Sequence, residues 1–178
     1  KRFRERHTAE SLIRLITRMM FVWFLKAKDL VPEQLFDKDT LDKFLKYNDK
    51  NESNYYKAVL QNLFFATLNT PMKKDAEKEG KQSRIFIGEA KKSGKKSEGY
   101  LQQQYYRYKS LMSDPDGLVN YFENIPFLNG GLFESLDVQT GNQQEKRVDW
   151  FTDPDAAQGF KKVNLIKVPD HIFFEDRT

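Results

Sequence analysis

The ten residues from Ile125 to Glu134, Ile-Pro-Phe-Leu-Asn-Gly-Gly-Leu-Phe-Glu, constrain the fold of this chain more than any other stretch. Pro126 has a fixed φ and disfavours a helical conformation at the residue before it, so a helix that approaches this point must end. Asn129, Gly130 and Gly131 tolerate positive φ, which favours a turn. The apolar residues on both sides are too large to be left in water. The sequence therefore predicts a buried turn, in which Pro126, Asn129, Gly130 and Gly131 have structural roles, anchored in a core built by upstream helices.

The composition is that of a folded, aromatic-rich domain. The 178 residues include 15 Phe and 8 Tyr, with 39% hydrophobic and 31% charged residues, which suffices for one core beneath a densely charged surface. There is no cysteine, which removes disulfides and thiolate metal sites and fits a reducing cytoplasm. The longest apolar run, Met19 to Leu25, is far shorter than the ~20 residues that span a bilayer. We therefore expect a soluble, cytoplasmic protein with no membrane partner.

The basic charge is concentrated in one stretch of the chain. Met72 to Glu98 holds nine Lys or Arg and five Asp or Glu, a net charge of +4 that equals the formal net charge of the whole chain. A solvated surface loop accounts for such a run, and contact with nucleic-acid phosphates is the functional alternative. The candidate phosphate contacts are Lys91, Lys92, Lys95 and Lys96, together with Arg107.

The first part of the chain has helical periodicity. From Thr8 to Lys28 apolar residues recur at spacings of three and four, which predicts a central helix with Thr8 as its N-cap, covered by neighbours on most sides. Arg14 and Arg18, four residues apart on one face, are expected to be solvated or ion-paired. The predicted inward face comprises Leu12, Leu15, Ile16, Met19, Met20, Trp23 and Phe24.

Shorter helices should follow the first one. Pro32 favours a short helical turn, and Asp39 or Thr40 is the expected N-cap of a helix that continues to about Tyr47. Ser53 or Asn54 is the expected cap of a helix from Tyr55 to Leu68, whose apolar stripe should pack against the first helix. Two more helices are predicted, at Tyr100 to Met112 and Leu118 to Asn124.

Strand signals are weaker and lie mostly near the C-terminal end. The predicted strands are Arg84 to Lys91, Arg147 to Phe151 and Val163 to Val168, with a turn at Gly141-Asn142. The expected fold class is therefore mainly α, an irregular helical bundle with long loops and a small extended or β part. We divide the chain into a helical domain at residues 1–137, with a flexible basic loop at 70–99, and an extended or β segment at 138–178. Because the chain begins without Met, it is expected to be a piece of a larger protein.

Catalytic motifs are sparse. His7 and His171 are far apart and have no neighbouring pattern of metal ligands, and neither Gly-x-Gly-x-x-Gly nor a Walker A sequence occurs. Glu89-Ala-Lys91 resembles the second half of the Pro-Asp...Asp/Glu-x-Lys core of Mg²⁺-dependent nucleases, in which two carboxylates hold the metal and a lysine assists the attacking water. The first half is missing, since Asp75, the nearest upstream acid, has no apolar strand to hold it. A nuclease that uses Glu89 and Lys91 remains an alternative.

Several sequence blocks occur in order along almost the whole chain. They are Leu12-Ile-Arg-Leu with Phe21-Val-Trp-Phe-Leu25 and Leu30-Val-Pro; Tyr55 to Asn69, with Asn-Leu-Phe-Phe at its centre; Tyr106-Arg-Tyr108; Ile125 to Asp137, with Pro-Phe-Leu-Asn-Gly-Gly-Leu-Phe; and Val148-Asp149. Together they resemble the helical region that precedes the catalytic domain in large DNA adenine methyltransferases, the type IIG restriction-modification enzymes and related phage-defence methylases.

This resemblance implies a bacterial parent enzyme that uses S-adenosylmethionine to methylate adenine N6, with a fused, Mg²⁺-dependent nuclease domain that cuts unmodified DNA. The cofactor-binding glycine loop and the Asn/Asp-Pro-Pro-Tyr/Phe sequence of such methyltransferases do not occur here. No catalytic residue, metal ligand or cofactor site is therefore expected in this chain. The family position of Glu89-Ala-Lys91, within a variable segment, also argues against the nuclease alternative.

The expected function is that of a non-catalytic connector, which sets the distance and orientation of nuclease, methyltransferase and target recognition domains. Its partners would be DNA, contacted at the backbone, and the rest of its own polypeptide. Residues 138–178 would then lead into the methyltransferase domain. A purely protein-binding scaffold, without affinity for DNA, is the second alternative.

Overall fold

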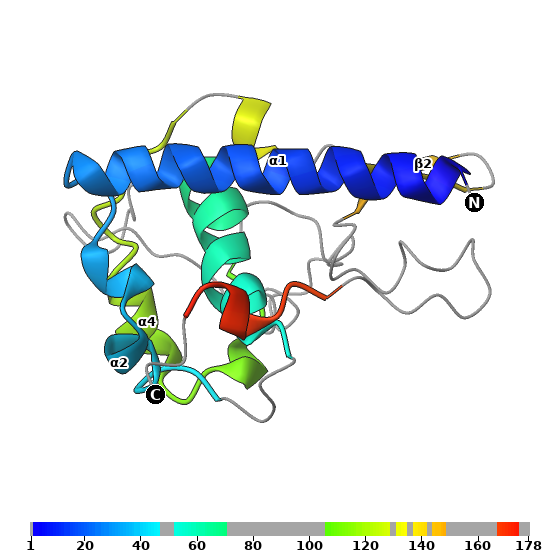
Figure 1. Ribbon diagram of the computed structural model, residues 1–178. Coiled ribbons are helices and arrows are strands. Elements are labelled where there is room, and N and C mark those ends of the chain that lie inside the picture. The colour runs from blue at the N-terminus through cyan, green and yellow to red at the C-terminus, as the bar shows by residue number, and fades with distance from the viewer. Residues whose placement is uncertain are drawn as a thin grey trace.

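A computed structural model describes residues 2–46, 52–70, 106–128, 131–134, 137–141, 144–148 and 167–174 (Figure 1). The fold is mainly α, as predicted. The helical elements are α1 (Arg2–Ala27), η1 (Glu33–Phe36), α2 (Lys38–Leu41), η2 (Tyr56–Leu60), η3 (Asn62–Leu68), η4 (Lys109–Leu111), α4 (Pro115–Asn120), η5 (Gly131–Phe133) and η7 (Asp170–Ile172). In the described part of the chain, no helix combines the length and the apolar character that crossing a membrane requires. The basic loop at 70–99 and the predicted strands at 84–91 and 163–166 lie outside the described residues.

The long helix α1 begins earlier than its sequence predicts, because Thr8 lies inside it and is not its N-cap. It ends in a Schellman motif. The N–H of Leu30 donates to the carbonyl of Leu25 at 3.0 Å, and the N–H of Asp29 donates to that of Lys26 at 2.9 Å. Asp29 adopts the left-handed conformation that this motif requires, with φ of 58°. The chain therefore turns sharply after α1 toward η1.

The buried face of α1 differs from the predicted one. Ser11, Leu15, Arg18, Val22 and Leu25 are buried, and their spacings of four and three place them on one side of the helix. Of the seven residues expected to face inward only Leu15 is buried and Met19 is half-buried; the exposed ones are Leu12, Ile16, Met20, Trp23 and Phe24. The expectation that α1 is covered on most sides is therefore wrong, because α1 lies along one side of the molecule (Figure 1).

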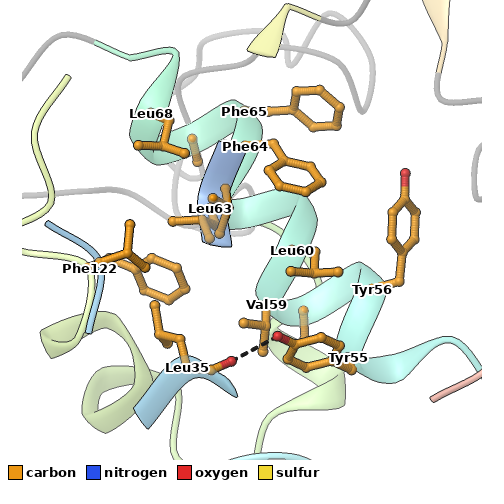
Figure 2. Packing of buried hydrophobic residues seen from close by; sticks show 14 of the residues in the cluster. Leu35, Tyr55, Tyr56, Val59, Leu60, Leu63, Phe64, Phe65, Leu68 and Phe122 are labelled. Carbon is orange, nitrogen blue, oxygen red and sulfur yellow. Dashed lines mark hydrogen bonds between the residues drawn. The ribbon is translucent and has the colours of Figure 1, made fainter. Parts of the chain in front are cut away.

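The helix predicted at Tyr55 to Leu68 is confirmed and forms the centre of the fold. Its two parts, η2 and η3, are π-helical and are joined at Gln61. Every residue from Ser53 to Leu68 is buried except Lys57, which is half-buried. A helix that is buried all round requires neighbours on every side, and Figure 2 shows its apolar side chains packed with Leu35 and Phe122 from other segments.

The segment after α1 packs on the central helix through η1 and α2. Pro32 precedes η1, as predicted. The N-cap of α2 is Asp37, whose carboxylate accepts from the N–H of Thr40 at 2.9 Å, so neither Asp39 nor Thr40 caps this helix. Leu35 lies in the core, and its carbonyl accepts from the hydroxyl of Tyr55 at 2.9 Å (Figure 2).

The prediction of a helix from Tyr100 to Met112 is wrong for the residues of this range that the structure describes. Tyr106 and Arg107 are not helical, and Tyr108 is left-handed, with φ of 61° and ψ of 35°. Only η4 follows, after which Met112 forms an isolated antiparallel bridge with Leu45. Contacts with distant parts of the chain therefore override the local helical pattern.

The predicted restart at Asp114-Pro115 is confirmed, and it opens α4. The carboxylate of Asp114 accepts from the N–H of Gly117 at 3.0 Å, and Pro115 takes the first helical position, which needs no N–H. The helix ends at Asn120, earlier than predicted, and the chain then enters the segment that contains the turn.

One small sheet is described. Strands β1 (Asp137–Gly141) and β2 (Gln144–Val148) are antiparallel, with Asp137 opposite Val148 and Gly141 opposite Gln144. The second strand overlaps the start of the strand predicted at 147–151. The small β part near the C-terminal end is thus a hairpin.

Candidate functional site

Only some of the predicted site residues lie in the described part of the chain. Lys91, Lys92, Lys95 and Lys96 lie outside the described residues, as do Glu89, Asn129 and Gly130. Arg107, Pro126 and Gly131 are described. Two predicted regions can therefore be described by their contacts, the turn and the surroundings of Arg107.

The entry to the turn is fastened to the central helix. Ile125 is fully buried, and its N–H donates to the carbonyl of Phe122 at 3.2 Å. Pro126, half-buried, then leads the chain to Leu128, whose N–H donates to the carbonyl of Leu68 at 2.9 Å. Because Leu68 ends η3, this bond satisfies one of the carbonyls that a helix end leaves without an intrahelical donor.

The exit from the turn is fastened to α1 by Arg18. Its Nε donates to the carbonyl of Leu132 at 2.8 Å, and its Nη2 donates to the carbonyl of Glu134 at 2.6 Å. The guanidinium also lies over the rings of Phe64 and Phe65, at 5.9 and 5.2 Å from their centroids. Arg18 is buried, so the expectation of a solvated or ion-paired side chain missed its main contacts. A planar guanidinium suits this arrangement, because its N–H groups point to the carbonyls within its plane while its faces lie against the rings.

Phe133 completes this joint between α1 and the central helix. Its ring centroid lies 5.8 Å from that of Phe21 and 5.9 Å from that of Phe64. The predicted burial of the turn's apolar flanks is thus confirmed at Ile125 and Phe133. Gly131 is exposed, its φ lies outside the left-handed region, and an added Cβ would meet no atom within 4 Å. The structure therefore gives no steric reason for glycine at position 131.

Arg107 lies in a second buried joint, between the central helix and the segment before η4. The backbone N–H of Arg107 donates to the Oδ1 of Asn62 at 2.7 Å, and the backbone carbonyl of Arg107 accepts from the Nδ2 of Asn62 at 3.0 Å. The same Nδ2 also donates to the carbonyl of Ala58 at 2.7 Å. The guanidinium lies 5.4 Å from the ring centroid of Phe65, and the residue is only 2% exposed. This burial contradicts the prediction that Arg107 contacts DNA phosphates.

The third joint is the N-terminal end of the central helix, where the C-terminal segment supplies the cap. Asp170 accepts from the N–H of Tyr55 at 2.8 Å and from that of Asn54 at 3.2 Å, across more than one hundred residues. The side chains of Ser53 and Asn54, the predicted caps, form other hydrogen bonds. The hydroxyl of Ser53 accepts from the N–H of Val168 at 3.0 Å, and the Nδ2 of Asn54 donates to the carbonyl of Lys46 at 2.9 Å.

Aromatic and ionic contacts support this cap. The ring of Tyr55 lies 5.0 Å from that of Phe173 and 4.8 Å from that of Phe174. The ammonium of Lys167 lies 2.9 Å from the carboxylate of Glu52. Burial raises the pKa of Asp170 from its ordinary 3.8 to about 6, although the two N–H groups that it accepts act in the opposite direction.

The polar side chains in these three joints hold segments of the fold together. Among the described residues, no three or more His, Cys, Asp or Glu side chains are grouped so that they could hold a metal ion. The groups brought together are buried guanidinium, amide and carboxylate side chains that bind backbone N–H and carbonyl groups. Sequence reasoning missed Arg18 and Asp170 as structural residues. The available signal was a charged side chain inside the largely apolar stretch Leu15 to Leu25 and another inside the apolar stretch Val168 to Phe174.

The chain is similar in sequence to a known protein. The chain is 30% identical over 128 residues, 70% of its length, to a protein of Methanocaldococcus jannaschii named "Putative type II restriction enzyme and methyltransferase RM.MjaORFECS2P". The matched region is 7% of that relative. No family model matches the chain, and no solved structure matches it. By sequence, the chain is therefore similar to one segment of a protein that is named as both a restriction enzyme and a methyltransferase.

Proposed function

We propose that this chain is a non-catalytic connector of a restriction-modification enzyme. The complete polypeptide would carry an S-adenosylmethionine-dependent adenine-N6 DNA methyltransferase and, in the type IIG arrangement, a Mg²⁺-dependent nuclease. The similarity to one segment of a named restriction enzyme and methyltransferase supports this proposal.

The observation that carries the proposal is that α1 and the C-terminal segment 167–174 are both fixed on the same buried helix. Arg18 fastens α1 to the turn, and the turn is bonded to Leu68 at the end of η3. Asp170 fastens the C-terminal segment to Asn54 and Tyr55 at the opposite end of that helix. A domain joined to either segment would thus be held at a set position, which is what a connector between catalytic domains requires.

Contact with the DNA backbone is the second part of the proposal. Lys91, Lys92, Lys95 and Lys96 supply closely spaced ammonium groups, which bind phosphates without reading sequence. Arg107 is not in the proposed set, since its guanidinium is buried against Phe65. The connector would in this way add affinity for DNA and leave recognition of the target sequence to another domain.

A salt titration of duplex DNA binding by the 178-residue chain, with and without Mg²⁺, tests both parts. The expected result is salt-dependent binding with intact DNA. Reversal of the four lysines to glutamate should weaken binding and reduce the slope of log K against log salt by roughly 3 to 4, since each phosphate contact contributes about 0.9. The matched control reverses four exposed lysines of the described surface, Lys38, Lys43, Lys46 and Lys109.

The outcomes separate the alternatives. Equal loss of binding in the two quadruple variants would contradict a specific role of the lysines at 91–96 and indicate a general effect of charge. Mg²⁺-dependent cleavage that Glu89→Ala abolishes would replace the connector with a nuclease. A chain that neither binds nor cuts DNA would leave only the protein-binding scaffold.

A further inference from the structure

The face of α1 that points away from the core is apolar. Ile13 is 63% exposed and Met20 is 69% exposed, and other exposed apolar side chains lie beside them. Six large apolar side chains of α1 share this outer face, namely Leu12, Ile13, Ile16, Met20, Trp23 and Phe24. Large contiguous apolar surfaces on soluble domains mark sites where another molecule binds.

The outer face has the spacing of a helix-packing seam. Ala9, Ile13, Ile16, Met20, Trp23 and Ala27 follow one another at intervals of four, three, four, three and four residues. This is the 3.5-residue period with which one helix packs along another over several turns. The inner face of α1, from Ser11 to Leu25, has the same period and is already occupied by the core.

The outer face is also symmetric along the helix. Ile16 and Met20 lie two residues on either side of Arg18, Ile13 and Trp23 lie five residues on either side, and Leu12 and Phe24 lie six. Arg18 itself points inward to the turn, so it does not interrupt the apolar surface. Two exposed apolar residues do not obey this symmetry. Phe21 packs on Phe133 at the flank, and Leu30 lies beyond the end of the helix.

We propose that this outer face binds a second copy of the chain, with the two α1 helices antiparallel and related by a two-fold axis at the level of Arg18. A two-fold interface must be self-complementary, such that residue i contacts residue j of the partner and j contacts i. The symmetry of the six residues meets this condition, because Ile16 faces Met20 of the other copy and Ile13 faces Trp23. Small residues at both ends of the seam, Ala9 and Ala27, would meet each other.

One pair of charges beside the seam, Glu10 and Lys28, agrees with the antiparallel direction, and Glu10 also pairs with Arg6 and Arg14 of its own helix. Glu10 lies eight residues before Arg18 and Lys28 lies ten residues after it. At 1.5 Å per residue, a two-fold axis at Arg18 would place Lys28 of one copy within about 3 Å, along the helix, of Glu10 of the other. Residues 10 and 28 are separated by five full helical turns, so they lie on the same flank. The ammonium of Lys28 lies 5.8 Å from the ring centroid of Phe24, which holds it beside the seam.

The size and rigidity of the outer face suit such an interface. Standard protein interfaces bury about 800 Å² on each partner, and the six large apolar side chains of the outer face are 47% to 69% exposed. Trp23 is held in place, because its ring lies 6.5 Å from that of Phe36 and 4.6 Å from the ammonium of Lys26. Fixed aromatic side chains contribute strongly to association.

Oligomeric state in solution tests the proposal. Light scattering coupled to size exclusion should give twice the 21.1 kDa mass of one chain at micromolar concentration. Ile13→Glu should raise the dimer dissociation constant at least 100-fold, since it places one charge opposite each Trp23. Ile172→Glu is the matched control, because Ile172 is equally exposed, at 64%, and lies outside α1, in η7. Circular dichroism checks that both variants remain folded.

The direction of pairing is tested with two complementary variants. Met20→Glu and Ile16→Lys should each be monomeric alone, while an equal mixture should form a heterodimer, because the introduced charges face each other across the two-fold axis. A monomeric unmodified chain would overturn the proposal and leave the outer face to another part of a longer polypeptide. A dimer that Ile13→Glu leaves intact, or two variants that do not associate when mixed, would overturn it as well.

Discussion

The Nε of Arg18 lies 2.8 Å from the carbonyl oxygen of Leu132, although the two residues are 114 positions apart in the sequence. This bond joins the middle of the longest helix to the exit of the Asn-Gly-Gly turn. The same guanidinium contacts Phe65 of the central helix. One side chain thus fixes three segments that no local sequence signal connects, and its loss should loosen all three.

Replacement of Arg18 tests this role. Arg18→Met keeps the apolar length of the side chain but leaves the carbonyls of Leu132 and Glu134 without their charged donor. Because hydrogen bonds to charged groups contribute about 1.5 to 3 kcal/mol each and buried partners are left unsatisfied, we expect a loss of about 3 kcal/mol in the free energy of unfolding. Urea denaturation measures it. Arg14→Met, on the same helix and more exposed, should change stability by less than about 0.5 kcal/mol.

The cap that Asp170 provides should make stability depend on pH. Its pKa is about 6 in the folded chain and 3.8 when unfolded, so the folded state binds the proton more tightly. The contribution of this group to stability is therefore full below pH 4 and is lost as the pH rises through about 6. The charges that bear on Asp170 are those of Glu52, which raises its pKa, and Lys57, which lowers it.

The measurement compares the unmodified chain with Asp170→Asn between pH 4 and pH 7. The unmodified chain should lose stability with rising pH relative to the variant, which has no carboxyl to titrate and can still accept one N–H bond. Asp37 does not disturb this window, because hydrogen bonds from Thr40 lower its pKa below 3.8, so its contribution is lost only in more acidic solution. Parallel curves for the two proteins would show that Asp170 does not titrate in this range.

Asn62 should be the most sensitive uncharged polar residue of the central helix. Its amide binds both the N–H and the carbonyl of Arg107 and holds that segment in a non-helical conformation. Asn62→Ala leaves a buried N–H and a buried carbonyl without these partners, so we expect a loss of about 2 to 4 kcal/mol. Thermal or urea unfolding measures the loss. Asn120→Ala, at an exposed position, is the control and should change stability little.

The sequence predicted the elements of this fold better than their contacts. The central helix was predictable because its apolar residues are dense and continuous, and the burial of Ile125 and Phe133 because large apolar side chains flank the proline and the glycines. The buried face of α1 was not. Two apolar stripes of the same period run along that helix, and the inner one is selected by contacts of Arg18 with distant carbonyls.

The non-helical conformation around Arg107 was missed for a related reason. Local periodicity favours a helix there, whereas the amide of Asn62, 45 residues earlier, binds the backbone of Arg107. The cap by Asp170 likewise depends on a partner more than one hundred residues away. Single side chains that bind distant backbone groups leave no periodic pattern, so sequence reading could not assign them.

Two glycines provide a matched pair for the last prediction. An added Cβ at Gly117 would collide with the carboxylate of Asp114 and lie 2.7 Å from the ring of Phe44, whereas at Gly131 it would meet nothing within 4 Å. Gly117→Ala should displace the Asp114 cap of α4. The loss of about 1 kcal/mol for a cap, together with the clash on Phe44, should exceed the gain of up to about 1 kcal/mol from alanine's helix propensity.

Gly131→Ala, in contrast, should be neutral or stabilise by up to about 1 kcal/mol, because alanine restricts the unfolded chain and fits the folded one without strain. Differential scanning calorimetry of the two variants gives the comparison directly. A strongly destabilised Gly131→Ala variant would mean that the turn does require glycine at this position, as its sequence alone suggests. Unchanged stability of Gly131→Ala would mean that the turn is held by the contacts of Arg18, Leu68 and Phe133. These contacts do not require glycine at position 131.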